Sequence, residues 1–233
     1  MSLFAASGVT VRYGAVRALE NVDIALEPGL VHGVIGPNGA GKSSFIDALS
    51  GRVRLAAGRV MYGGVDITGR SARWRRRHGI SRSFQRTSVF GSLRVGDQLE
   101  MVAVRNEEKD LDGIIERLGL APVLDQVCSE IAYGTQRLVD LALALIGNPR
   151  VVLLDEPCAG LAADESAQML DHVRALCKER NMAALLVEHD VDGVFRCCDV
   201  ITVLNLGKVL ATGTPAEVRA NDAVVKAYLG SAA

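Results

Sequence analysis

The stretch that decides the fold is an apolar run followed at once by a glycine-rich loop, Val31-His32-Gly33-Val34-Ile35-Gly36-Pro37-Asn38-Gly39-Ala40-Gly41-Lys42-Ser43. From Gly36 onward the loop matches the pattern G-x-x-x-x-G-K-[ST] at every fixed position. Glycines let a backbone wrap a phosphate with its N–H groups pointing inward, and a following helix adds a partial positive charge. The stretch therefore predicts a strand, a phosphate-binding loop and a helix.

The loop residues have separate expected roles at the phosphates. We expect the Lys42 ammonium to bridge the β- and γ-phosphates, the Ser43 hydroxyl to bind Mg²⁺, and Ser44 to contact a further phosphate oxygen. The other loop residues expected to contact ATP are Gly36, Asn38, Gly39, Ala40 and Gly41. A chance glycine turn before a helix is the alternative, and the preceding apolar run disfavours it.

Short apolar or β-branched runs alternate with helical patterns along the rest of the chain, which is typical of α/β architecture. We expect strands at 22–26, 31–35, 151–154, 183–187 and 200–204. The runs at 151–154 and 184–187 are almost continuously apolar, as in a parallel sheet that is covered on both faces. Chemistry then belongs at the carboxyl ends of these strands.

The predicted elements assemble into one domain, residues 1–233. Residues 95–130 lack strand-like runs, and their apolar spacing is typical of short helices. We interpret 95–146 as a helical subdomain inserted in the α/β core. Residues 208–212 are predicted to form a hairpin with 200–204, and Pro215 to open a terminal helix.

Two carboxylates, Asp155 and Glu156, directly follow the strand predicted at 151–154. We expect Asp155 to hold Mg²⁺ through water, and Glu156 to accept a proton from the water that attacks the γ-phosphate. Many strands end in acids that only face solvent. The prediction therefore depends on the complete phosphate loop upstream.

The composition excludes several other classes of protein. Hydrophobic residues make up 49% and charged residues 23%, a globular balance, and a net charge of −1 gives no general attraction to nucleic acid or anionic lipid. No apolar run approaches the roughly 20 residues that cross a bilayer, and no secretory signal is evident, so we expect a cytoplasmic protein. The five cysteines lack C-x-x-C spacing and predict reduced, structural thiols.

Several motifs, in family order and over nearly the whole chain, resemble those of the ABC ATPases. Tyr13, in the stretch 13–19, resembles the aromatic residue that stacks on adenine. Gln85 resembles the family's glutamine that reaches metal and water, and His189 resembles the histidine that contacts the γ-phosphate. Alone, each of these three residues would have an ordinary structural explanation.

This resemblance implies a P-loop NTPase fold of the ABC ATPase type, with a mostly parallel core sheet, an N-terminal antiparallel β subdomain and the helical insert. It implies ATP and Mg²⁺ as ligands. The metal ligands it implies are Ser43, Gln85 and Asp155, and the catalytic residues are Lys42, Gln85, Glu156 and His189.

Residues 131–136 are similar to the family signature, which closes over ATP bound to the opposite subunit. Gly134 would there let the backbone approach the γ-phosphate at a helix N-terminus. Ala132 stands where the family usually has serine, which removes a hydrogen bond to a charged group worth about 1.5–3 kcal/mol. Ala162 replaces an acidic or amide residue in the loop after Glu156. Because the sites are composite, we hypothesise a heterodimer with two unequal ATP sites.

The stretches 66–69, 79–85, 213–218 and 227–230 resemble the ATPases of branched-chain amino acid importers. The implied partners are transmembrane permease subunits, a second ATPase subunit in a homo- or heterodimer and, indirectly, a solute-binding protein, with no nucleic acid. The implied location is peripheral, on the inner face of the cell membrane through the permease. Related subunits serve urea, other amides and lipopolysaccharide export, so the cargo stays open.

Two other functions stay open. One is a soluble ABC ATPase of DNA repair or translation, although the chain shows neither a coiled-coil insert nor a second ATPase unit. The other is a regulatory module that binds ATP without turnover, which Glu156 and His189 disfavour. The arginines at 70, 73, 75, 76 and 77 suit lipid headgroups, a permease or nucleic acid, but we favour a solvated helix face.

Overall fold

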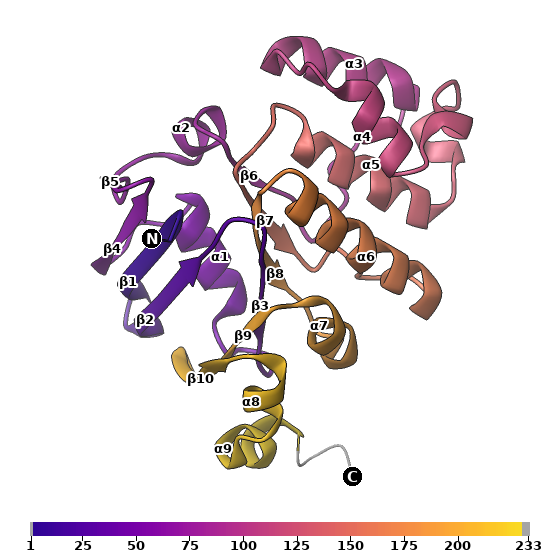
Figure 1. The fold of residues 1–233 in the computed structure, drawn as a ribbon. Helices are drawn as coiled ribbons and strands as arrows, with labels where there is room; N and C mark the ends of the chain where they lie inside the picture. The colour runs from indigo at the N-terminus through magenta and orange to yellow at the C-terminus, as the bar shows by residue number, and fades with distance from the viewer. Residues whose placement is uncertain (1, 230–233) are drawn as a thin grey trace.

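Four of the predicted apolar runs lie in one sheet of six strands, in the order β10-β9-β3-β8-β7-β6. The computed structural model describes residues 2–229 (Figure 1). The strands of this sheet are β3 (Val31–Ile35), β6 (Ile80–Arg82), β7 (Val151–Asp155), β8 (Ala183–Val187), β9 (Val200–Asn205) and β10 (Lys208–Gly213). Every pair is parallel except β9 with β10, which form the predicted hairpin. The mostly parallel core sheet is confirmed.

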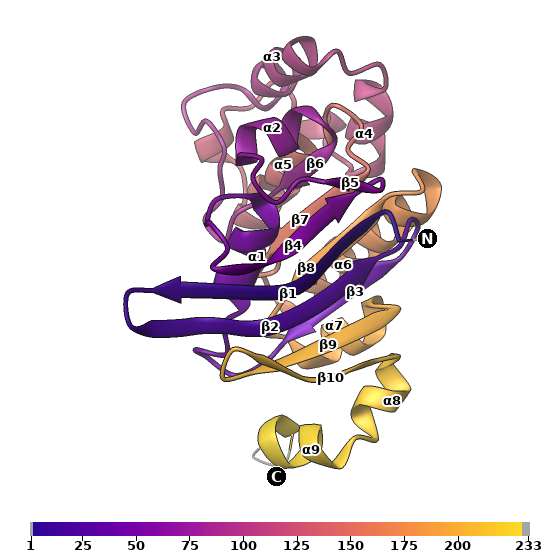
Figure 2. The ribbon, with the colours of Figure 1, turned by 90° about the vertical axis from the view of Figure 1, so that its left-hand side faces the viewer.

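A second sheet is antiparallel and has the order β2-β1-β4-β5. Its strands are β1 (Phe4–Tyr13), β2 (Val16–Leu26), β4 (Ala57–Tyr62) and β5 (Val65–Asp66). Figure 2 shows β1, β2 and β4 in front of the core sheet. The N-terminal antiparallel β subdomain is therefore confirmed, and the run predicted at 22–26 is the second half of β2.

The helices fall into three groups along the chain. α1 (Lys42–Ser50) and α2 (Ala72–Arg77) follow strands of the N-terminal half. Between β6 and β7 lie α3 (Val95–Asn106), α4 (Leu111–Arg117), the 3₁₀ turns η1 (Ala121–Val123) and η2 (Cys128–Glu130), and α5 (Tyr133–Leu145), gathered at one end in Figure 1. The third group is α6 (Ala163–Glu179), α7 (Val191–Cys197), α8 (Pro215–Arg219), α9 (Asp222–Val224) and the π-helical turn η3 (Val225–Leu229).

The terminal helix α8 begins at Pro215, as predicted. The preceding Thr214 caps it, because its hydroxyl accepts a hydrogen bond from the Glu217 N–H while the Glu217 carboxylate accepts from the Thr214 N–H. Gly230, in the last stretch that resembles the importer ATPases, lies outside the described residues.

The central strands are buried on both faces, as their continuous apolarity predicts. In β7, Val152 and Leu154 face a core shared with the helices from α3 to α7, whereas Val151 and Leu153 face a core shared with α1 and the antiparallel sheet. Fully burying one such side chain stabilises the fold by about 1.5–3 kcal/mol. The site-bearing ends of β3 and β7 are therefore rigidly held.

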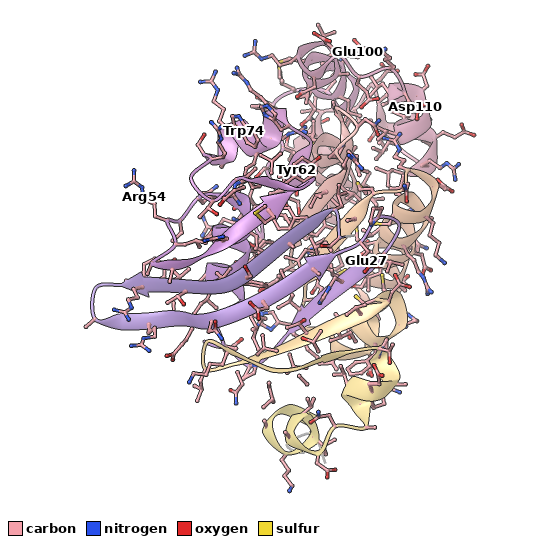
Figure 3. The ribbon with its side chains drawn as sticks, turned by 60° about the vertical axis from the view of Figure 1, so that its left-hand side comes forward. Glu27, Arg54, Tyr62, Trp74, Glu100 and Asp110 are labelled. Carbon is pink, nitrogen blue, oxygen red and sulfur yellow. The ribbon has the colours of Figure 1, made fainter. Side chains whose placement is uncertain are left out.

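The arginine run on α2 is not a uniformly solvated helix face, and that expectation is wrong for Arg75. Arg73 and Arg77 are exposed, but Arg75 is only 1% exposed. Its guanidinium donates to the carbonyl oxygens of Leu49 at the end of α1 and of Ile67. The reason is that helix carbonyls at a buried C-terminus need donors. Figure 3 shows that Arg54, in contrast, projects away from the ribbon.

All five cysteines, including the adjacent Cys197 and Cys198, are buried and free. This agrees with structural thiols. Among residues 2–229, no helix combines the length and the apolar character that crossing a membrane requires.

Candidate nucleotide site

The glycine-rich loop connects the buried strand β3 to α1, and its glycines are needed for close backbone approach. A Cβ atom on Gly36 would lie 2.2 Å from the Leu204 carbonyl oxygen, and one on Gly41 would lie 2.8 Å from the Ala18 carbonyl oxygen. Gly41 also has a φ of 104°, in the region that favours glycine. Neighbouring strands therefore fix the loop against the start of α1.

A cavity of about 410 Å³ opens above this loop. It brings together nine residues that the sequence predicts, namely Asn38, Gly39, Ala40, Gly41, Lys42, Ser43, Ser44, Glu156 and His189. Five lining residues were not predicted, namely Val16, Arg17, Ala18, Leu206 and Gly207. These five come from the start of β2 and the β9–β10 turn, so only the tertiary fold places them at the loop.

Lys42 lies in the wall of the cavity and is almost fully buried. Its ammonium donates to the carbonyl oxygens of Gly36, at 2.6 Å, and Pro37, at 3.2 Å. Burial lowers the pKa of Lys42 from its ordinary value, and the Glu156 carboxylate opposes that shift. The cation is thus held by the loop that would surround a phosphate.

Glu156 also lines the cavity and has two side-chain partners. Gln85 donates through Nε2 to Glu156 Oε2 over 2.7 Å, and His189 Nε2 lies 2.8 Å from Glu156 Oε1. Glu156 also has a φ of 49°, which a residue with a side chain rarely adopts. Two residues from separate loops, Gln85 and His189, therefore converge on the Glu156 carboxylate.

Asp155 lies beside Glu156 and forms an ion pair with Arg82, whose guanidinium nitrogen is 2.8 Å from Asp155 Oδ2. Arg82 also donates to Asp47 and Ser50 of α1. Burial raises the pKa of Asp155, while Arg82 opposes that shift. Sequence reasoning missed Arg82, because nothing in its local pattern shows that β6 lies next to β7.

Five predicted residues do not line the cavity with the rest, namely Tyr13, Gly36, Gln85, Gly134 and Asp155. Tyr13 is about half exposed at the end of β1, where it pairs with the lining residue Val16. Gly36 meets Lys42 through its carbonyl oxygen, and Gln85 reaches the cavity wall through Glu156. The positions of these residues neither support nor contradict their predicted roles.

The signature stretch is separate from the cavity. Gly134 lies in the first turn of α5 and packs against Glu165 of α6. Ala132 is the N-cap of α5 and makes no side-chain hydrogen bond there. Tyr133 reaches the loop after β7, since its hydroxyl donates to the Ala159 carbonyl oxygen over 3.3 Å.

A phosphate loop on a parallel strand, with a carboxylate and a histidine across one cavity, defines a P-loop nucleotide-binding protein. The sequence matches the ABC transporter family over residues 19–159, and residues 208–233 match the family described as branched-chain amino acid ATP-binding cassette transporter. The chain therefore belongs to the ABC transporter family of ATP-binding cassettes, which bind and hydrolyse ATP.

Similar curated proteins cover almost the full length. The chain is 32% identical to the high-affinity branched-chain amino acid transport ATP-binding protein BraF of Pseudomonas aeruginosa, over 97% of each chain. It is 31% identical to the LivG protein of the same description from Escherichia coli, over 99% of this chain and 98% of LivG. It is also 30% identical to the lipopolysaccharide export system ATP-binding protein LptB of Haemophilus influenzae, over 99% of this chain and 98% of LptB.

Solved structures agree with the fold. MJ1267, an ATP-binding cassette of an ABC transporter in its ADP conformation, superposes with a TM-score of 0.89 at 28% identity, over 99% of each chain. The ABC ATPase fold class is confirmed.

Proposed function

We propose that this chain is the ATP-hydrolysing subunit of an ABC transporter that imports branched-chain amino acids or a related small solute. The observation that carries the proposal is the cavity in which Lys42 and Ser43 face Glu156 and His189. The loop provides N–H groups and an ammonium for phosphates, and the carboxylate provides a base.

We assign the roles of these groups from the resemblance to the ABC ATPases, and their positions support the assignment. Lys42 and the N–H groups of residues 38–44 bind the β- and γ-phosphates, and Ser44 contacts a further oxygen. Glu156 accepts the proton of the attacking water, while Gln85 and His189 orient its two carboxylate oxygens. His189 is half exposed and is free to contact the γ-phosphate. Tyr13, beside Val16 at the rim, stacks on the adenine.

Mg²⁺ fits the donor set, since the Ser43 hydroxyl, the Gln85 amide oxygen and the Asp155 carboxylate are the oxygen ligands that it prefers. Gln85 donates to Glu156 through Nε2, which leaves its amide oxygen available. When bound with ATP, the ion neutralises charge that develops on the phosphate oxygens.

The partners follow from family membership and from the names of the relatives. The chain pairs with a second ATPase subunit, with Gly134 closing over the partner's ATP, and the helices at 95–146 pass the motion of closure to permease subunits. We infer a peripheral location on the inner face of the membrane, through the permease. A solute-binding protein completes the importer indirectly.

The cargo assignment rests on BraF, LivG and the family match at residues 208–233. BraF, LivG and LptB are all ATP-binding proteins of transport systems, which does not favour a non-transport ATPase or a regulatory module. Export is the second candidate, because LptB is almost as similar.

The unequal-site hypothesis depends on Ala132 and Ala162. Ala132 at the N-cap of α5 provides no hydroxyl for a γ-phosphate or for the helix itself. A partner ATPase with serine at this position would complete the Lys42 site fully. Full, cooperative ATP hydrolysis by this chain without a partner would contradict the hypothesis.

Calorimetry with Mg-ATP tests the nucleotide site. The parent chain is expected to bind ATP and Lys42→Ala to lose measurable binding, whereas Lys178→Ala, on the exposed face of α6, keeps it. Equal binding by the parent and Lys42→Ala would refute the site. Reconstitution with its permease in vesicles, followed by uptake of labelled leucine, tests the cargo.

A further inference from the structure

Arg137 of α5 connects two loops of the site through backbone carbonyl oxygens. Its side chain is 1% exposed. Its Nη1 donates to the carbonyl oxygens of Phe84, at 3.3 Å, and Gln85, at 3.1 Å. Its Nε donates to the Pro157 carbonyl oxygen over 2.9 Å, and its Nη2 donates to that of Glu156. One planar guanidinium therefore holds both loops that carry the Gln85–Glu156 pair.

The turn at 156–158 is also held from other directions. The Glu156 N–H donates to the Val187 carbonyl oxygen over 2.9 Å. The Glu188 carboxylate, buried at the end of β8, accepts from the Cys158 N–H over 2.7 Å. The Arg137 guanidinium and the Glu188 carboxylate thus form hydrogen bonds to neighbouring peptide groups of the same turn.

These hydrogen bonds account for the unusual backbone conformation of Glu156. A non-glycine residue rarely adopts a φ of 49° and persists there only where its surroundings fix it. The Glu156 N–H, its carbonyl oxygen and both carboxylate oxygens all have partners.

The nearest carboxylate to the guanidinium is not its main partner. Asp140 Oδ2 lies 3.9 Å from Arg137 Nη1, and Asp140 Oδ1 accepts from the Ser88 N–H over 3.1 Å. The close partners of the Arg137 guanidinium are therefore backbone carbonyl oxygens of two loops rather than a carboxylate. This arrangement fixes the two loops relative to each other.

We infer that Arg137 is a positioning residue that sets the backbone of Gln85 and Glu156 and ties their geometry to the N-terminus of α5, where Gly134 lies one turn away. The inference rests on the proposed function. In a dimer, Gly134 faces the ATP of the other site, so Arg137 mechanically links the signature of one ATP site to the water-activating carboxylate of the other.

Arg137→Lys and Arg137→Met test the inference in the full chain. Lysine keeps the charge but has a single ammonium, which cannot span carbonyl oxygens of both loops. Arg76→Met is the matched control, because Arg76 donates to the Ile146 carbonyl oxygen over 2.7 Å at the other end of α5 and contacts neither loop. The measurements are Mg-ATP affinity by calorimetry, kcat and KM for ATP hydrolysis, and thermal unfolding.

We expect kcat of Arg137→Lys to fall at least tenfold while the Kd for Mg-ATP stays within twofold. Arg76→Met is expected to unfold at a lower temperature with kcat within twofold of the parent. If Arg137→Met does not fold, Arg137→Lys decides.

Three results would overturn the inference: kcat of Arg137→Lys within twofold of the parent, equal losses of kcat in Arg137→Lys and Arg76→Met at equal loss of stability, or loss of ATP binding together with turnover. A parent chain that neither binds nor hydrolyses ATP would instead refute the proposed function. The ratios of kcat and Kd between variant and parent test the inference, whereas the values of the parent itself test the proposed function.

Discussion

Gln85 and Glu156 lie 71 positions apart in the chain, yet their side chains meet, with Gln85 Nε2 donating to Glu156 Oε2 over 2.7 Å. The opposite carboxylate oxygen faces His189 Nε2 at 2.8 Å. The carboxylate is therefore held in one orientation above a loop built for phosphates.

Replacing Glu156 with glutamine is expected to retain Mg-ATP binding and to abolish turnover. The amide cannot accept the proton of water, and general-base catalysis is typically worth about 10²–10⁴ in rate. Without hydrolysis the closed dimer should accumulate on ATP, which size-exclusion chromatography detects. Glu179→Gln, at the exposed end of α6, serves as the control. Hydrolysis by Glu156→Gln at the parental rate would disprove the assignment.

Arg82→Met is expected to lower the free energy of unfolding by about 3–5 kcal/mol, because it leaves the largely buried Asp155 without its cation. Arg52, which is half exposed and lies 3.6 Å from the partly buried Asp47, provides the comparison, and Arg52→Met should cost about 0–1 kcal/mol. Urea unfolding of both variants measures the difference. Equal losses of unfolding free energy in the two variants would show that the Arg82–Asp155 pair stabilises the fold no more than the Arg52–Asp47 pair.

The sequence alone predicts the fold well where a pattern is local. The buried strand β8 is a continuous apolar run, β7 is one up to its final Asp155, and β3 is an apolar run interrupted by His32. Thr214-Pro215 marks the start of α8 because caps are set by neighbours in sequence. The phosphate loop is predicted for the same reason.

What the sequence hides is the consequence of strand order. Arg82 meets Asp155 only because β6 pairs with β7, and Leu206 reaches the cavity only because the β9–β10 hairpin ends beside the loop. Arg75 was wrongly predicted to be solvated, because it lies in a run of charged residues. In the fold it is buried against the end of α1. Pairings between distant segments leave no local pattern.

Arg75→Met is expected to destabilise the fold by several kcal/mol. It would strip donors from carbonyl oxygens that include those of Leu49, Ile67 and Arg70, and each unsatisfied buried acceptor costs about 1–3 kcal/mol. Arg77→Met, on the exposed side of the same helix, is the control and should lie within about 0.5 kcal/mol of the parent. Chemical denaturation checks both. If Arg75→Met has the same free energy of unfolding as the parent, the buried hydrogen bonds of Arg75 do not stabilise the fold.

His32 gives the fold a dependence on pH. It lies buried in β3, where its Nδ1 donates to the Ala25 carbonyl oxygen over 3.2 Å and its Nε2 accepts from the Thr202 hydroxyl over 2.8 Å. Burial lowers its pKa from 6.5 to about 4, because the charged imidazolium loses its hydration. The folded chain therefore keeps this ring neutral at a pH where the unfolded chain binds a proton.

Because the unfolded state binds more protons between about pH 6.5 and 4, stability must fall as the pH drops through that window. The loss has a slope of at most about 1.4 kcal/mol per pH unit and reaches about 2 kcal/mol between pH 7 and pH 5. Below about pH 4 both states are protonated and this contribution becomes constant. Urea unfolding at pH 7 and pH 5 should show this loss in the parent beyond that of His32→Gln, since the variant has no ring to protonate. Identical pH dependence in both proteins would show that His32 titrates alike in the folded and unfolded chains.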